Sequence, residues 1–413
     1  MANLIPILTL EAQLKRAFRS HLKELGFTRK KNGWLQPAAN DKEAIRTLHH
    51  HQRKDKLKRE DIFVQKNREK LLHYFADGTE VEPKQIKPRL IEVKSKTLEA
   101  DLFRFATLLW SIPVSEGYGR RIRFLAMDAA KNRLMGLFAL GDPVFNLRDR
   151  DRWIDWDAED RRKRLSNVMD CYVLGAVPPY NSLLCAKMIA CMVRSKEVWL
   201  TFRNKYSGKK GIISGEYKNP QLALVTTTSA LGRSSIYNRL LINGRRYFES
   251  VGYTSGWGHF HIPDILYANI REYLLKKKHP YADHNRFGDG PNWRLRTIRA
   301  ALELLGYDPT ILCHGVAREV FACEFASNSR DFLGGRRKKL NVDVLPSYEA
   351  TAELALHRWI VPRSERCQDF KLWKKELILE AIQCSNSLTA KDRIKKGATM
   401  TLSKCGSISN KRT

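Results

Sequence analysis

The chain has 413 residues, of which 43% are hydrophobic, which predicts two or three folded domains and excludes a chain that is disordered throughout. Lysine and arginine number 74 against 44 acidic residues, a formal net charge of +30 at pH 7. This excess attracts polyanions and favours nucleic-acid contact over a surface charged only for solubility. No apolar run is long enough to span a bilayer and no secretory leader is visible, so we expect a cytoplasmic protein without membrane contact.

The cysteines indicate reduced thiols rather than a structural zinc site. No two of the eight have the C-x-x-C spacing that zinc and redox sites use. Several lie inside apolar segments such as CYVLGAV (171–177), so we expect them to be buried small hydrophobic residues. The cysteines are Cys171, Cys185, Cys191, Cys313, Cys323, Cys367, Cys384 and Cys405.

Residues 1–96 are expected to form a basic, helical N-terminal region. Residues 9–25 carry apolar side chains at helical spacing after Thr9, a suitable N-cap. Residues 41–75 predict a second, longer helix. Residues 77–96 hold two prolines and mixed charge, which indicates a linker.

Residues 97–279 have the pattern of strands and helices that is typical of an α/β domain. Apolar runs at 122–127 and 134–140, separated by a short polar turn, predict a hairpin of two strands. The next expected elements are an arginine-rich loop at 146–156, a strand at 171–177, a helix at 181–203 and a strand at 222–228. This order predicts one mixed, mostly antiparallel sheet with helices, an α/β (α+β) fold class.

The remainder divides into a folded part and a tail. Residues 280–385 are expected to form a basic α/β region, with a helix after a Gly-Pro turn and a strand at 316–326. Residues 386–413 are polar and basic with few large apolar side chains, so we expect disorder there.

Residues 226–261 hold the densest group of candidate catalytic residues. The segment TTTSALGRSSIYNR predicts a strand end and then a helix starting near Ser234, where free backbone N–H groups would favour an anion. Tyr237 and Asn238 follow and can face a cleft, in which the Tyr237 hydroxyl would act as a general acid. His259 comes next, after a glycine-spaced aromatic turn. Plain N-capping by Ser234 and a core position for Tyr237 are the structural alternatives.

The loop NLRDRDRW (146–153) suggests a phosphate clamp. Arginine forks bind phosphate in two places, neighbouring aspartates would orient them, and Trp153 would stack a base. A solvated ion-pair network and a buried tryptophan are the alternatives. Basic residues elsewhere extend the prediction to a phosphate backbone. The nucleic-acid candidates are Arg148, Arg150, Arg152, Trp153, Arg233, Ser234, Ser235, Arg239, Arg286, Arg294, Arg296, Arg299, Arg336 and Arg337.

Two groups of histidines bear on metal binding. The triplet at 49–51 is not a metal site by spacing, because successive helical positions diverge by about 100°, and a solvated helix face is favoured. His259 and His261 alternate along an apparent strand and, with Asp264, can ligate a metal. An H-x-H pair alone is weak evidence, so no metal and no cofactor are predicted.

Longer stretches of the sequence resemble a known family. RFLAMDAAKNRLMGLFALGDPVFNLRDRDRWIDWD, TTTSALGRSSIYNRL, VGYTSGWGHFHIPD and HNRFGDGPNWRLRTIRAALELLG, with HGVAREVF and RWIVPRSER, are similar to the protein A (DruA) family of the Druantia antiphage defence system. The likeness covers roughly residues 10 to 375. It implies a component of a multi-gene bacterial defence island whose recurrent partner is a very large helicase-like protein.

The order of the central elements also resembles the GNAT superfamily of N-acyltransferases and, distantly, the phage Mom-type DNA-modifying proteins. In this likeness 122–127 and 134–140 form the leading hairpin, and the strand at 171–177 is the one that splays. Acyl-CoA binding needs a glycine-rich turn whose backbone N–H groups hold the pyrophosphate. Here that turn is Pro178-Pro179-Tyr180, and prolines supply no N–H, so acyl-CoA and ordinary acetyl transfer are disfavoured.

Three functions follow as hypotheses. The first is a defence component that binds DNA together with the other Druantia proteins, the large helicase-like one included. The second is an enzyme that modifies or processes nucleic acid in a GNAT-like cleft. The third is a protein-interaction scaffold of the defence complex. The sequence contains no Walker loop, G-x-S-x-G or H-E-x-x-H motif, which argues against a nucleotide-driven motor or a hydrolase of those types.

Overall fold

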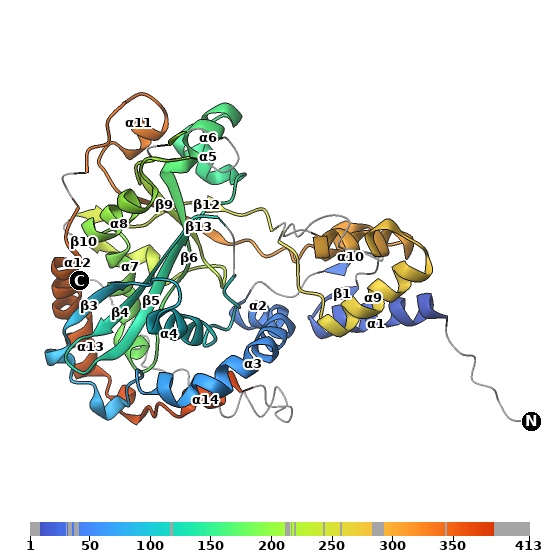
Figure 1. Ribbon diagram of the computed structural model, residues 1–413, viewed down its shortest axis with the longest axis horizontal. Coiled ribbons are helices and arrows are strands. Elements are labelled where there is room, and N and C mark those ends of the chain that lie inside the picture. The colour runs from blue at the N-terminus through green and yellow to red at the C-terminus, as the bar shows by residue number, and fades with distance from the viewer. Residues whose placement is uncertain are drawn as a thin grey trace, which may run out of the picture.

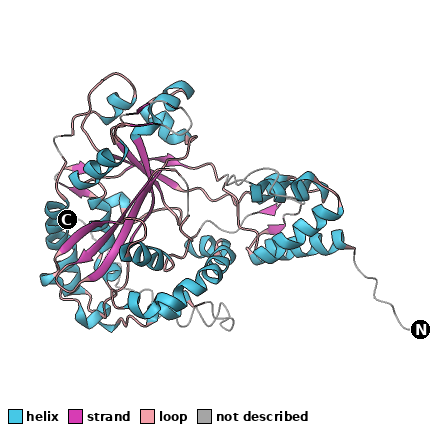
Figure 2. Ribbon diagram, viewed as in Figure 1, coloured by secondary structure: helices cyan, strands magenta, loops and turns pink. Residues whose placement is uncertain are grey.

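The computed structural model has a large body built on one sheet and a smaller helical lobe beside it (Figure 1). It describes residues 9–29, 31, 35–36, 41–115, 119–210, 215, 217–218, 220–242, 244–256, 258–282, 293–342 and 345–383. Helices cover both faces of the sheet, as Figure 2 shows. The expected α/β class is therefore confirmed.

The central sheet has seven strands in the order β12-β13-β9-β6-β5-β4-β3. They are β3 (Pro88–Glu92), β4 (Arg121–Asp128), β5 (Arg133–Gly141), β6 (Val168–Ala176), β9 (Leu224–Thr228), β12 (Glu249–Tyr253) and β13 (Glu319–Glu324). Neighbouring strands are antiparallel except for β6 and β9. The expected hairpin is confirmed as β4 and β5, because both strands are apolar enough to be buried on both faces.

The parallel pair of β6 and β9 is short. It joins only Val168 to Leu224, Met169 to Val225 and Asp170 to Thr226, although both strands continue further. The likeness to the GNAT sheet stays a prediction.

The sheet crosses the boundaries expected from the sequence. β3 lies within 77–96, so the expected linker contributes an edge strand, and β13 comes from the expected C-terminal region. The divisions placed after residues 96 and 279 therefore do not separate independent sheets. The tail at 386–413 lies outside the described residues.

One face of the sheet carries the largest hydrophobic core. It is covered by α7 (Cys185–Met192), α8 (Lys196–Tyr206) and α12 (Tyr348–Ala355), which bury side chains such as Met188 and Phe202 completely. The helix expected over 181–203 is instead a 3-10 turn (Tyr180–Leu183) followed by α7 and α8. Leu184 adopts a left-handed conformation (φ 63°) between the turn and α7, which interrupts the helix.

The opposite face has two separate cores. One is covered by α3 (His50–Leu72), α4 (Leu98–Thr107) and α14 (Leu377–Ile382). The other lies under α5 (Arg148–Ile154), with α6 (Ala158–Arg164) and α11 (Ser329–Leu333) beside it. The loop expected at 146–156 was therefore wrong, since α5 occupies most of it.

The helical lobe joins the N-terminal helix to helices that come more than 200 residues later in the chain (Figure 1). Its core joins α1 (Leu10–Glu24), α9 (Asp264–Lys276) and α10 (Trp293–Leu304) and reaches α2 (Lys42–Leu48). Thr9 caps α1 by accepting from the Ala12 N–H (3.2 Å), as expected. The long helix expected at 41–75 is broken into α2 and α3.

Small elements complete the fold. The two-stranded pairs are β1 (Thr28–Arg29) with β2 (Leu35–Gln36), β7 (Lys209–Lys210) with β8 (Tyr217–Lys218), and β10 (Leu241–Ile242) with β11 (Arg245–Arg246). A further short helix, α13, spans Val361–Arg366. The cysteines of the described part are free, and four of them are buried. Among the described residues, no helix has the length and apolar character that crossing a membrane requires.

Candidate nucleic-acid interface

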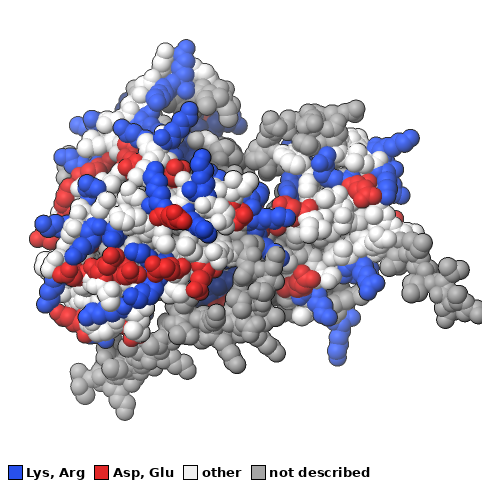
Figure 3. All heavy atoms as spheres, turned by 60° about the horizontal axis from the view of Figure 1, so that its bottom comes forward, with Lys and Arg blue, Asp and Glu red and all other residues white. Residues whose placement is uncertain are grey.

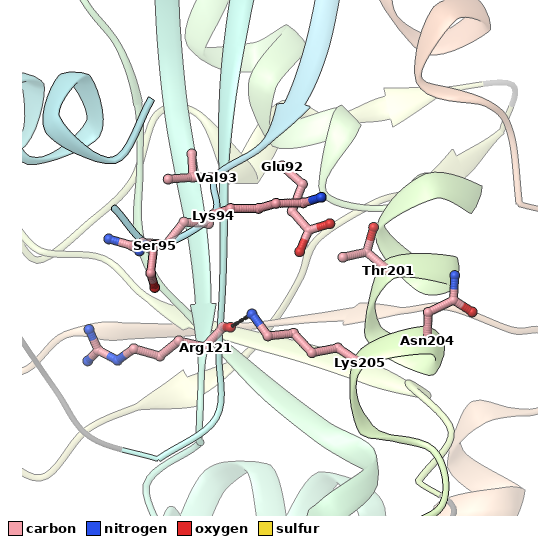
Figure 4. A pocket seen from close by; sticks show the side chains of 9 residues that line it. Glu92, Val93, Lys94, Ser95, Arg121, Thr201, Asn204 and Lys205 are labelled. Atoms are coloured by element: carbon pink, nitrogen blue, oxygen red, sulfur yellow. Dashed lines mark hydrogen bonds between the residues drawn. The ribbon is translucent and has the colours of Figure 1, made fainter. Parts of the chain in front are cut away.

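A basic groove runs along the first residues of β4. It consists of two hollows, of about 660 and about 460 Å³, that share Ser95, Arg121 and Arg123. The first is bounded by the segment after β3 and by α8, and Figure 4 shows Lys94 and Ser95 on one side and Thr201, Asn204 and Lys205 on the other. The second extends toward α3 and α4.

The end of β3 creates this groove. β3 pairs with β4 only as far as Phe124, and the Val93 N–H donates the last bond to the Arg123 carbonyl (2.8 Å). The edge of β4 that β3 leaves unpaired is then met by α8. Tyr206 Oη accepts from the Arg121 N–H (2.7 Å), and Lys205 Nζ donates to the Arg121 carbonyl (2.8 Å; Figure 4). Side chains of α8 thus take the place of a neighbouring strand.

The groove is electropositive. Its lining includes seven basic side chains and three acidic ones. The basic residues are Lys56, Lys94, Lys96, Arg104, Arg121, Arg123 and Lys205, and the acidic ones are Glu60, Glu92 and Asp101. Glu60 is engaged by Lys56 (2.9 Å) and Arg104 (2.7 Å). When Lys56 and Arg104 are set aside as partners of Glu60, the remaining basic residues of the lining are Lys94, Lys96, Arg121, Arg123 and Lys205.

Arg121 lies where the two hollows meet. Its guanidinium lies over the Tyr172 ring, 4.7 Å from the centroid, and Nη1 is 3.5 Å from the Tyr172 hydroxyl, a long contact. Its Nε is buried and has no hydrogen-bond partner within the described residues. A buried N–H without an acceptor costs about 1 to 3 kcal/mol. A ligand that brings an anionic oxygen into the groove would remove this cost.

Two neighbouring side chains share this environment. The Arg123 guanidinium lies 5.6 Å from the Phe103 ring centroid. Burial lowers the pKa of Lys205, and the charge of Glu92 opposes this effect. The groove therefore holds cations that are partly removed from water, a setting in which an anion is bound more strongly than on an open surface.

The arginine-rich segment at 146–153 is arranged differently from the expected clamp. Arg148 and Arg152 are exposed on α5, but Arg150 is fully buried. Its guanidinium binds Asp151 (2.6 and 2.8 Å) and the carbonyls of Val144 and Phe145, an arrangement that fits the alternative of an ion-pair network better than a phosphate clamp. The fork of Arg150 is already filled by protein acceptors.

Three further candidates lie near α5: Trp153, Arg336 and Arg337. Trp153 is half-buried, and the Arg330 guanidinium lies 4.7 Å from its ring centroid. A base cannot stack on the ring face that Arg330 covers. Arg336 and Arg337 are exposed after α11, which belongs to the same core as α5, and Arg336 pairs with Asp331 (2.9 Å). These residues form a second basic surface, separate from the groove.

The Arg-Ser-Ser segment does not start a helix as expected. Only a three-residue 3-10 turn, η5 (Tyr237–Arg239), follows it. The Ser234 hydroxyl accepts from the backbone N–H groups of Ile236 (3.1 Å) and Tyr237 (3.3 Å). Ser234 therefore uses the N–H groups that an anion was expected to use. The side chains of Arg233, Ser235 and Arg239 are exposed.

Tyr237 belongs to the core and not to an open cleft. It is 7% exposed, and its ring lies 4.8 Å from Phe248 and 5.0 Å from Phe321 between centroids. Burial raises the pKa of its hydroxyl strongly, and the hydroxyl is hydrogen-bonded to Thr227. A phenol held in this way is a poor proton donor to solvent or substrate, so the structure favours the core position for Tyr237 over the general acid.

Replacing Tyr237 by phenylalanine should therefore change stability slightly and function not at all. Loss of one buried hydroxyl bond is expected to lower the free energy of unfolding by about 1 kcal/mol. Urea unfolding and protection of cells against phage would be measured side by side. A folded variant that has lost protection would restore Tyr237 as a catalytic residue.

The other catalytic candidates have separate partners. The Asn238 amide donates to the Ser234 carbonyl (2.8 Å) and to Glu319 (3.2 Å). The backbone of His259 forms an isolated antiparallel β-bridge with Cys313, and His259 Nε2 lies 3.0 Å from Arg299 Nη2. Burial, followed by the charge of Arg299, lowers the pKa of His259. Among the described residues, Tyr237, Asn238 and His259 thus make no contact with one another that would join them into one catalytic group.

The arginines of α10 lie on the helical lobe. Arg294 pairs with Asp264 (2.9 Å) and stacks on Tyr267, Arg299 meets His259, and Arg296 is exposed. Arg286 lies outside the described residues. None of the nucleic-acid candidates with described side chains lines either hollow of the groove. The sequence did carry a hint of it: in RIRF, Arg121 and Arg123 are two apart and so share a face of one strand.

Comparison with known proteins decides the family. The sequence profile described as Druantia protein DruA matches residues 39–335. The chain belongs to the DruA family. It is 48% identical over 372 residues to "Druantia protein DruA" of Escherichia coli (strain UMEA 4076-1), with 90% of this chain and 92% of that protein covered. No solved structure matches this DruA-family chain significantly.

Proposed function

We propose that this DruA-family chain is the component of a Druantia-type antiphage defence system that holds DNA by its phosphates in the groove. The observation that carries the proposal is the buried Arg121 Nε without a partner, in a groove with a surplus of basic residues. The net charge of +30 supports it, because a polyanion is attracted from a distance before any contact forms.

Phosphate fits this groove better than a carboxylate or a small neutral ligand does. Guanidinium groups bind phosphate oxygens with two parallel N–H donors, and Arg121 and Arg123 leave the same face of one strand. Exposed Lys94 and Lys96 add point charges at the rim. The surplus of cationic donors in the groove suits phosphate oxygens, so binding would follow the backbone and depend weakly on sequence.

The charge of the chain is not gathered into one uniform patch. On the face shown in Figure 3, lysine and arginine lie among acidic side chains, which form a band of their own. DNA would therefore be held along limited tracks such as the groove and the surface of α5 and α11. The large helicase-like protein implied by the family would act on the same DNA.

Replacing Arg121 and Arg123 together by glutamine should lower the affinity for DNA and make that affinity less dependent on salt concentration. Each lost phosphate contact is expected to lower the slope of log K against log salt by about 0.9 for duplex DNA. The affinity at low salt should fall by about tenfold or more. Fluorescence anisotropy with labelled duplex and single-stranded DNA, titrated with NaCl, measures both quantities.

The matched control removes two arginines elsewhere. Arg19 and Arg366 are exposed and touch neither hollow, so Arg19→Gln with Arg366→Gln changes the charge equally. The control should keep most of the wild-type affinity and slope. Equal losses in the two double variants would show that net charge alone binds DNA. Absence of DNA binding by the wild type at low salt would refute the proposal and favour a protein scaffold with an acidic partner.

A further inference from the structure

Histidines and carboxylates gather where the helical lobe meets the body. Three segments supply them in pairs: His21 and Glu24 from α1, His51 and Asp55 from α3, and His261 and Asp264 from the start of α9. In α1 and α3 the two members are three or four residues apart, which puts both on one side of the helix, and His261 lies just before α9 begins at Asp264. They form two triads, His21–Glu24–His51 and Asp55–His261–Asp264, each with its potential ligand atoms within 4.8 Å of one another.

The first triad has the donors that zinc prefers. It offers two imidazoles and one carboxylate, and His51 Nε2 lies 3.2 Å from a Glu24 oxygen. The rings of His21 and His51 are 5.1 Å apart between centroids. His21 is buried, His51 is half-buried and Glu24 is exposed, so the triad opens from the core toward solvent.

His21 is oriented as a metal ligand would be. Its Nε2 lies 2.9 Å from the carbonyl oxygen of His261, so Nε2 must carry the proton and Nδ1 the lone pair. A ligand histidine commonly donates its other ring N–H to a backbone carbonyl in this way, which fixes its tautomer. Burial lowers the pKa of His21 to about 4, which keeps the ring neutral at pH 7.

The second triad is already satisfied as an ion-pair network. Asp55 accepts from His261 Nε2 (2.7 Å) and from the Asp264 N–H (3.1 Å). Arg294 neutralises Asp264 at 2.9 Å. A cation entering here would have to displace an arginine and a short hydrogen bond. In the first triad, the ion-pair partner of Glu24 is His51 (3.2 Å), itself a potential ligand.

We propose that His21, Glu24 and His51 bind a divalent transition metal of the zinc class. Three protein ligands leave one position for water or for a further ligand. The ion would join α1 of the helical lobe to α3 of the body, so its binding energy would add to the stability of this junction. The site is independent of the proposed DNA groove, which shares none of these three residues.

The test is zinc binding by the full chain, made without a histidine tag and stripped with a chelator. Equilibrium dialysis should find one Zn²⁺ per chain in this site, and zinc should raise the melting temperature. His51→Ala and Glu24→Gln are each expected to weaken zinc binding at least tenfold and to abolish the thermal shift. Cobalt substitution gives a visible absorption spectrum as a second readout of the same site.

The controls use neighbours with the same chemistry. His50→Ala removes an exposed histidine next to His51 and should leave zinc binding unchanged. Asp264→Asn alters only the second triad and should also have no effect. The proposal is overturned if the wild type binds no zinc, if His51→Ala binds it as tightly as the wild type, or if Asp264→Asn is the variant that loses it. Glu24→Gln changes one exposed side chain, so a folded protein is available even if other variants misfold.

Discussion

Replacing Arg150 by methionine is expected to lower the free energy of unfolding by about 3 to 5 kcal/mol. The guanidinium is 0% exposed and donates to Asp151, Val144 and Phe145. Its removal leaves two carbonyls without donors and Asp151 with Arg161 as its remaining partner (2.8 Å). Urea unfolding at pH 7 measures the loss.

Arg152→Met is the matched control, because Arg152 is exposed on the same short helix. It should change stability by no more than about 0.5 kcal/mol. The comparison separates a structural arginine from a DNA contact. A stable Arg150→Met variant with reduced DNA affinity would mean that Arg150 serves as a phosphate ligand after all.

Arg150 also shows why the segment around it was misinterpreted from the sequence. Alternating charges such as those of RDRD usually indicate solvated loops, because isolated charges are costly to bury. Here the charges neutralise one another, with Arg150 and Arg161 both bound to Asp151. Such pairing depends on which side chains meet in three dimensions, and no periodicity reveals it.

Elements governed by local rules were predicted well. The helix at 9–25 has a capping threonine and an apolar stripe, and the strands at 122–127 and 134–140 are continuous apolar runs around a turn. β3 was missed because PRLIE is short, begins with proline and lies at an edge of the sheet. Its strand state comes from pairing with β4 and has little support in its own sequence.

The groove and the histidine junction were not predicted from the sequence, for a related reason. The groove joins Lys94, Arg121 and Lys205, which three separate elements bring together. The junction brings residues of α1 and α3 to the start of α9, across 240 residues between His21 and His261. The triplet at 49–51, expected on a solvated face, instead has His49 buried (6%) against Arg318.

Acid is expected to weaken the contact between the helical lobe and the body strongly. His21 and His314 are 4% and 5% exposed, and burial lowers the pKa of each to about 4 from an ordinary value of 6.5. The charges of Arg318, His49 and His259 lower the pKa of His314 further, and its Nδ1 accepts from the Val316 N–H (2.9 Å), a bond that protonation of Nδ1 would break. His21 is surrounded by His51, Glu24 and His261, of which the Glu24 carboxylate and the His261 carbonyl favour the charged ring.

The sign of the effect follows from proton binding. Between pH 6.5 and about 4 the unfolded chain binds protons at both histidines while the folded chain does not, so the free energy of unfolding falls as the pH falls through this window. Each histidine is expected to contribute roughly 3 kcal/mol of this loss. Urea unfolding at a series of pH values measures this loss.

His314→Gln removes one of the two titrating groups, so the stability of this variant should depend less steeply on pH. His73→Gln, at an exposed histidine, should follow the wild type. Equal slopes for His314→Gln and the wild type would show that the junction histidines do not govern acid stability, and that carboxylates elsewhere in the chain do.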